Sequence, residues 1–212
     1  MKTMLMLFMI ALLAAPTAIA ETYNVEIIGM VEFNLINDGP FAEVMTGDEV
    51  LIEFTLDSEA YLDSETYPTR GYVIDMMSYW LHMGAVTVGL QEPYPDGMIP
   101  YFVLRNNDPA VDGFFISNGV DWPSSLPVNE MGGIDPYFGS VFSVGYGEET
   151  LDSLEIADAV GTYDYDGLTN FYFGVIDGPV DVIGFEFTQL VISGGGVAVE
   201  AKSLSQVKSL FH

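Results

Sequence analysis

The stretch VLIEFTL, residues 50–56, places an apolar residue at every second position. Successive side chains of a β-strand point to opposite faces of a sheet, so a repeat of two marks a strand with one buried face. Glu53 and Thr55 are expected to face outward. The residues expected to face the core are Val50, Ile52, Phe54 and Leu56. This segment predicts a half-buried strand of the kind that builds antiparallel sheets.

Comparable strand patterns recur on both sides of this stretch, with turn residues between them. Strands are expected at 23–35, 99–104, 113–117, 137–146, 171–176 and 182–193, and two more within 71–90 with a break near Gly84. Gly29 is expected to mark a bulge or bend in the first of them. Short strands without alternating helices predict an all-β fold, an antiparallel β-sandwich or jelly roll, over residues 21–193.

Several details of this pattern are specific enough to be checked. Residues 74–83 also have the composition of a helix, since Met and Leu favour one. Residues 57–69 read as an acidic loop, 118–136 as a long loop, and 148–158 as a segment with a short helical turn. In the last strand, the residues expected to share one face are Phe185, Phe187, Gln189 and Val191.

Both ends of the chain lie outside the predicted domain. Residues 1–20 read as a signal peptide, with Lys2, an apolar run over residues 5–15 and a small-x-small cleavage site that ends at Ala20. The run is short for a bilayer span, which needs about 20 apolar residues. A secreted location, extracellular or periplasmic, is expected, with no membrane span after signal cleavage. Residues 194–212 read as a Gly-rich linker and a short tail, either frayed or, as the less favoured alternative, a docking helix.

Composition narrows the classes of function. The chain has 5 Lys and Arg against 31 Asp and Glu, a formal net charge of −26 at pH 7. This field repels nucleic acid and anionic lipid and attracts cations. The chain has no cysteine, which excludes disulfides, thiolate metal sites and cysteine catalysis. General solubility and specific Ca²⁺ binding both explain the acidity, and solubility is the simpler explanation.

Several segments together resemble the exported bacterial PEP-CTERM proteins, which are sorted by exosortase. The segments are 47–50 leading into 54–58, 71–72, 86–89, 106–108 with Asp112, and 187–190. The resemblance covers residues 25–193 and implies a β-rich surface or matrix protein. The C-terminal sorting motif of that group is missing here, so the expectation is a released protein. The resemblance implies no catalytic residues.

Few residues could support familiar catalysis. The only histidines are His82 and the terminal His212, and no Gly-x-Ser-x-Gly elbow occurs. Paired carboxylates could form a glycosidase, but 31 acidic residues make chance pairing common. Trp80 is expected in the core. Trp122, between Asp121 and Pro123 in the long loop, is the expected ligand-contact residue.

Three acidic segments are the best candidates for calcium: 57–65, 108–112 and 163–167. The predicted metal ligands are Asp164 and Asp166, which form a fragment of a calcium loop, and Asp108 and Asp112. Each segment alone offers fewer than the six to eight oxygens that Ca²⁺ takes. No other cofactor is expected.

These observations predict a non-enzymatic extracellular surface or matrix interaction module, with Ca²⁺ as a candidate stabiliser. Its expected partner is an extracellular polysaccharide or protein, and not a nucleic acid. The alternative is a carbohydrate-binding module or a carboxylate-based glycan hydrolase. A groove with aromatic lining and two carboxylates would favour that alternative.

Overall fold

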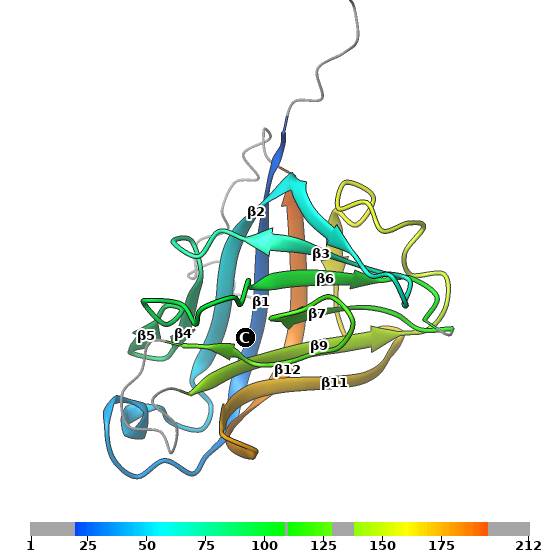
Figure 1. Ribbon diagram of the computed structural model, residues 1–212. Helices are drawn as coiled ribbons and strands as arrows, with labels where there is room; N and C mark the ends of the chain where they lie inside the picture. Colours follow the sequence, from blue (N-terminus) through cyan, green and yellow to red (C-terminus); the bar gives the residue numbers. More distant parts are fainter. Residues whose placement is uncertain (1–19, 109, 129–137, 195–212) are drawn as a thin grey trace, which may run out of the picture.

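Twelve β-strands form one antiparallel sheet in the computed structural model, which describes residues 20–108, 110–128 and 138–194 (Figure 1). The strands are β1 (Thr22–Asn34), β2 (Glu49–Asp63), β3 (Thr69–Ile74), β4 (Trp80–Met83), β5 (Val86–Val88), β6 (Tyr101–Arg105), β7 (Asp112–Ser117), β8 (Leu126–Pro127), β9 (Gly139–Tyr146), β10 (Gly161–Tyr163), β11 (Leu168–Asp177) and β12 (Val180–Gly194). A short 3-10 helix, η1 (Pro40–Glu43), follows β1. The predicted all-β antiparallel class is confirmed.

The sheet closes on itself and forms two layers. Because β1 pairs with both β12 and β2, eight strands form a ring in the order β1, β12, β11, β9, β7, β6, β3, β2. In Figure 1, β1, β2 and β12 run steeply through the view, and β3, β6, β7, β9 and β11 cross them. This arrangement is consistent with a β-sandwich or jelly roll, in which bends in strands let them pass between layers.

The strand β2 shows how one chain segment serves both layers. Its first half, Val50–Glu53, pairs with β4, and its second half, from Leu56 to Asp63, pairs with β3. The predicted alternation over residues 50–56 is confirmed, because all four of the core-facing residues are buried. The expected loop at 57–69 is shorter in the structure, since residues 57–63 continue β2, with Asp63 opposite Arg70, and only 64–68 lie outside the strands.

Apolar side chains from both layers fill the space between them. The core is rich in aromatic rings, such as Phe54 against Phe102 at 5.5 Å between centroids and Phe173 against Phe185 at 4.9 Å. A second, smaller cluster lies on the other face of β6 and β7. It consists of Tyr101, Val103, Phe115 and Val120, with Val73 packed against it.

Bulges decide which residues face the core. The register between β1 and β12 shifts after Ile28, so β12 has one extra residue, Thr188, at the position where Gly29 was predicted to mark an irregularity. An extra residue reverses the alternation. Phe185 and Phe187 are therefore buried as predicted, but the residues buried beyond the bulge are Leu190 and Ile192 rather than Gln189 and Val191.

The structure also tests the predicted break at Gly84, two predicted helical segments and the predicted burial of Trp80. The break at Gly84 is confirmed, with a positive φ of 58° at the turn between β4 and β5. The helical alternative for 74–83 was wrong, since this segment holds strands and a turn. Residues 148–158 contain no helix but end in a hydrogen-bonded turn, in which the Asp158 backbone N–H donates to the Glu155 carbonyl. Trp80 was expected in the core, but 43% of its surface is exposed because Leu81 and Met83 occupy the core face of β4.

Some predictions fall outside the described residues. They are the signal peptide up to residue 19, the tail from 195 onward, and most of the second half of the 118–136 loop. Within the described ranges, no helix has the length and apolar character needed to cross a membrane.

Candidate functional site

The side chain of Trp122 is exposed at the surface and held by a neighbouring ring. It is 59% exposed and lies edge-on to Tyr67, with 4.6 Å between the ring centroids and 65° between the ring planes. Tyr67 comes from the turn between β2 and β3, whereas Trp122 lies in the segment after β7. We call these two residues the aromatic platform. Tyr67 limits the orientations that the indole can adopt and leaves much of its surface in solvent.

Hydrogen bonds within residues 117–125 fix the shape of the loop that carries Trp122. The Ser117 hydroxyl donates to the Trp122 carbonyl oxygen at 2.7 Å. The Asn118 backbone N–H donates to the Ser124 hydroxyl at 2.9 Å, and the Asn118 side-chain amide donates to the Ser125 carbonyl at 2.7 Å. Such local bonds replace strand pairing in a turn, so the loop is ordered before any ligand arrives.

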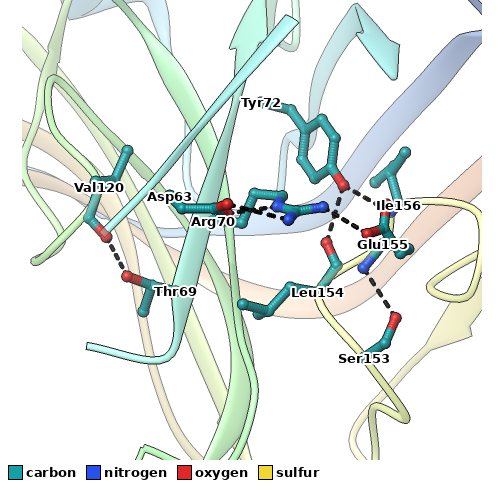
Figure 2. Close-up of polar contacts among 9 residues, drawn as sticks. All are labelled: Asp63, Thr69, Arg70, Tyr72, Val120, Ser153, Leu154, Glu155 and Ile156. Atoms are coloured by element: carbon teal, nitrogen blue, oxygen red, sulfur yellow. Dashed lines mark hydrogen bonds and ion pairs between the residues drawn. The ribbon is translucent and has the colours of Figure 1, made fainter. Parts of the chain in front are cut away.

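Two further bonds join this loop to the β2–β3 hairpin. The Thr69 hydroxyl donates to the Val120 carbonyl oxygen at 2.6 Å (Figure 2). The Ser64 hydroxyl donates to the Asp121 carboxylate at 2.5 Å and accepts from the Tyr67 backbone N–H at 2.9 Å. Ser64 therefore links the two segments that carry the rings of the aromatic platform. Val120 packs into the smaller apolar cluster, which anchors the loop against the sheet.

An arginine network supports the same hairpin on its other side. The Arg70 guanidinium makes two bonds to Asp63, at 2.5 and 3.1 Å, and one to Glu155 at 2.7 Å (Figure 2). It also lies 4.1 Å from the centre of the Tyr61 ring. The hydrogen bond with Asp63 raises the pKa of Arg70 further above its ordinary value. Planar guanidinium groups suit this forked contact, which fixes orientation as well as charge.

Tyr72 continues the network into residues 154–156. Its hydroxyl donates to the Leu154 carbonyl and accepts from the Ile156 backbone N–H, each at 2.9 Å (Figure 2). Burial raises the pKa of Tyr72 above its ordinary value, so the hydroxyl keeps its proton as a donor at neutral pH. The loop after β9 is thereby fixed to β3.

The four predicted metal ligands do not gather in one place. Asp112 is buried, and its two oxygens accept three backbone N–H groups: Asn107 at 2.7 Å, Thr150 at 2.7 Å and Leu151 at 2.8 Å. Asp108 lies with one oxygen 3.8 Å from Nε of Arg105. The Asp112 carboxylate therefore organises two loops through backbone hydrogen bonds.

Asp164 and Asp166 form a local turn on the surface. The Asp166 backbone N–H donates to the Asp164 carboxylate at 2.8 Å, and the Tyr146 hydroxyl donates to the Asp164 carbonyl at 2.9 Å. Across residues 20–108, 110–128 and 138–194, no three acidic or histidine side chains converge as a metal site would require. Calcium binding stays a prediction.

His82 lies on the outer face of the sheet between two polar side chains. Its Nδ1 is 2.9 Å from the Thr87 hydroxyl, and its Nε2 is 3.3 Å from the Glu53 carboxylate. A hydroxyl, an imidazole and a carboxylate in series resemble a hydrolase triad. Thr87 is also the direct cross-strand partner of His82, and such pairs stabilise hairpins. We therefore interpret the contact between His82 and Thr87 as a cross-strand pair that stabilises the β4–β5 hairpin.

The sequence predicted Trp122 as a contact residue but did not reveal that Tyr67 lies beside it. Tyr67 lies 55 positions earlier, in a segment that read as part of an acidic loop, and only the pairing of β2 with β3 brings it to the loop after β7. The signal available was a tyrosine directly before Pro68 in a turn, which indicates exposure and nothing about its neighbour.

No protein-family model matches the chain, and no curated protein or solved structure matches it either. The resemblance to PEP-CTERM proteins therefore stays a prediction.

Proposed function

We propose that this chain is an exported, non-enzymatic interaction module that binds a neutral extracellular polysaccharide through Trp122 and Tyr67. One observation carries the proposal: the exposed Trp122 ring is held edge-on to Tyr67 by a loop with its own hydrogen bonds. Loops on rigid scaffolds are the usual carriers of binding residues.

The surroundings of the platform fit a sugar better than a protein partner. Asp121 directly precedes Trp122, and its carboxylate accepts a hydrogen bond from Ser64. Sugars combine apolar C–H faces with hydroxyl groups that a carboxylate can bind. A stable protein interface buries about 800 Å² on each side, far more than two rings supply. The net charge of −26 repels acidic polysaccharides, which favours neutral ones.

Retention in affinity gels tests the proposal. The wild-type protein is run through gels that contain cellulose derivatives, xylan or dextran, beside Trp122→Ala, Tyr67→Ala and Trp80→Ala. Trp80 is the matched control, since it is the other tryptophan and 43% exposed, on the outer face of β4. We expect Trp122→Ala to weaken retention about tenfold or more, as the loss of a central aromatic contact does. Trp80→Ala should behave as the wild type.

Two results would count against the proposal. Equal loss in Trp122→Ala and Trp80→Ala, or no retention in any gel, would remove the platform from the binding role. Release of reducing ends from the same polysaccharides by the wild-type protein would replace the non-enzymatic module with a glycan hydrolase. Thermal unfolding of each variant establishes that the fold is retained.

A further inference from the structure

A shallow depression of about 180 Å³ lies where β1, β11 and β12 meet. It is separate from the aromatic platform, because none of its lining residues belongs to the β2–β3 hairpin or to the loop after β7. In Figure 1 the turn between β11 and β12, close to this depression, lies at the lower end of the molecule. The side chains that matter for its chemistry are Glu32, Phe33, Phe171, Tyr172 and Asp181.

Two of the residues that line the depression are glycines on neighbouring strands. Gly174 and Gly184 are direct cross-strand partners. A Cβ atom on Gly184 would collide with the Phe33 ring, and one on Gly174 would lie 2.5 Å from the Ile183 carbonyl oxygen. The Phe33 ring therefore lies directly against Gly184. Glycine at these two positions allows the Phe33 ring and the neighbouring backbone to approach this closely.

Two acidic residues, Glu32 and Asp181, line the depression together with its aromatic residues. Glu32 is the extra residue of a bulge, since the register between β1 and β12 passes from Val31 to Phe33. Bulges re-aim side chains and occur often beside binding sites. Asp181 accepts a hydrogen bond from the Tyr172 hydroxyl. Desolvation and this bond raise the pKa of Tyr172 to about 12, so the tyrosine stays a neutral donor at physiological pH.

We propose that this depression binds the cationic group of an organic ligand, an alkylammonium or a guanidinium. Glu32 and Asp181 supply the counter-charge, and the rings of Phe33 and Tyr172 supply faces that attract cations. Among the described residues that line the depression there is no lysine, arginine or histidine, so the lining itself provides no cation for these carboxylates.

The composition of the lining selects an organic cation over other ligands. Aromatic faces attract ammonium and guanidinium groups within about 6 Å of the ring centre. A metal ion needs several converging oxygens, whereas rings make up much of this lining. A neutral sugar would gain nothing from the charge of −26, which raises the local concentration of any cation. An amino sugar, a polyamine or a basic side chain would each present the required group.

Nuclear magnetic resonance of the aromatic rings tests the assignment. The probes are n-propylammonium and n-propylguanidinium, with n-propanol as the neutral control of similar shape. We expect saturable shifts at the Phe33 and Tyr172 rings with both cations and none with n-propanol. Glu32→Gln and Asp181→Asn should each weaken binding about two- to fivefold, as partly exposed ion pairs do. Asp96→Asn removes one charge from an exposed turn outside the lining and should change the affinity less than either.

The outcomes separate support from refutation. Equal shifts with n-propanol, shifts that do not saturate, or equal effects of Glu32→Gln and Asp96→Asn would overturn the proposal. Tighter binding of glucosamine than of n-propylammonium would support it and identify an amino sugar as the source. Tighter binding of N-acetylarginine amide would support it and identify a basic side chain. Failure here leaves the polysaccharide result at Trp122 unaffected, because the variants differ.

Discussion

Glu26 on β1 lies directly opposite Glu53 on β2, on the outer face of the sheet. The neighbouring strands partly desolvate the Glu26 carboxyl, and the negative charge of Glu53 adds to this effect. Both raise the pKa of Glu26 above its ordinary value. His82 contacts Glu53 on the opposite side at 3.3 Å, so a protonated imidazole would partly offset the charge of Glu53.

This carboxylate pair predicts a stability that falls as pH rises. Because the pKa of Glu26 is raised in the folded state, the folded protein binds more protons than the unfolded chain at pH values between the unfolded and the folded pKa. The stabilising contribution of the protonated Glu26 carboxyl is therefore present below the unfolded pKa and is lost as pH rises through the folded pKa. Glu26→Gln removes the effect. We expect the variant to unfold at a higher temperature than the wild type at pH 7, by an amount that shrinks toward pH 4. Like charges directly opposite cost about 0.2–1 kcal/mol.

Thermal unfolding at low salt measures this difference, with Glu186→Gln as the control. Glu186 is exposed and has the uncharged Met30 as its cross-strand partner. Parallel pH curves for Glu26→Gln and the wild type would show that the pair does not destabilise the fold.

Because the carboxylate of Asp112 is buried, we expect a large loss of stability when Asp112 is replaced by asparagine. The carboxylate accepts three backbone N–H groups from two loops, and the NH₂ group of an asparagine side chain at this position would face donors in place of an acceptor. We expect Asp112→Asn to lower the free energy of unfolding by about 2–4 kcal/mol, the cost of unsatisfied buried donors. Chemical denaturation measures it. Asp164→Asn, in an exposed turn, should stay within about 0.5 kcal/mol, and equal losses in the two variants would contradict the assignment.

The Arg70 network predicts that lysine cannot replace arginine. Lysine keeps the charge but cannot make the forked contact with Asp63 while it also reaches Glu155. Arg70→Lys should cost about 1 kcal/mol and speed hydrogen exchange at the Ile156 N–H, which donates to the Tyr72 hydroxyl. Glu155→Gln, which removes one partner only, should have a smaller effect. Unchanged exchange at Ile156 in Arg70→Lys would show that the loop is held independently.

The excess of acidic residues predicts stabilisation by salt. Screening reduces repulsion among charges that sum to −26, so the unfolding temperature should rise with NaCl. A Ca²⁺ titration against Mg²⁺ and NaCl at equal ionic strength, after EDTA treatment, tests the predicted calcium site. A saturable rise with Ca²⁺ alone would establish it through the link between binding and stability. Equal responses to all three salts would refute it.

Local alternation explains how much of the fold could be predicted. The pattern of residues 50–56 fixes the core face of β2, because side-chain direction along an uninterrupted strand depends only on parity. The alternation cannot be extrapolated past an extra residue, because the side chains beyond it point to the opposite faces. Thr188 reverses the faces in β12, and this cannot be predicted from β12 without its pairing to β1.

The sequence by itself determined the all-β class, the core face of residues 50–56 and the exposure of Trp122, because each follows from a few neighbouring residues. Only the tertiary structure decided that Tyr67 holds Trp122, that Asp112 faces backbone donors, and that Glu32 and Asp181 line the same depression. These relationships join segments far apart along the chain. They depend on strand register and ring closure of the sheet, which nearby residues do not encode.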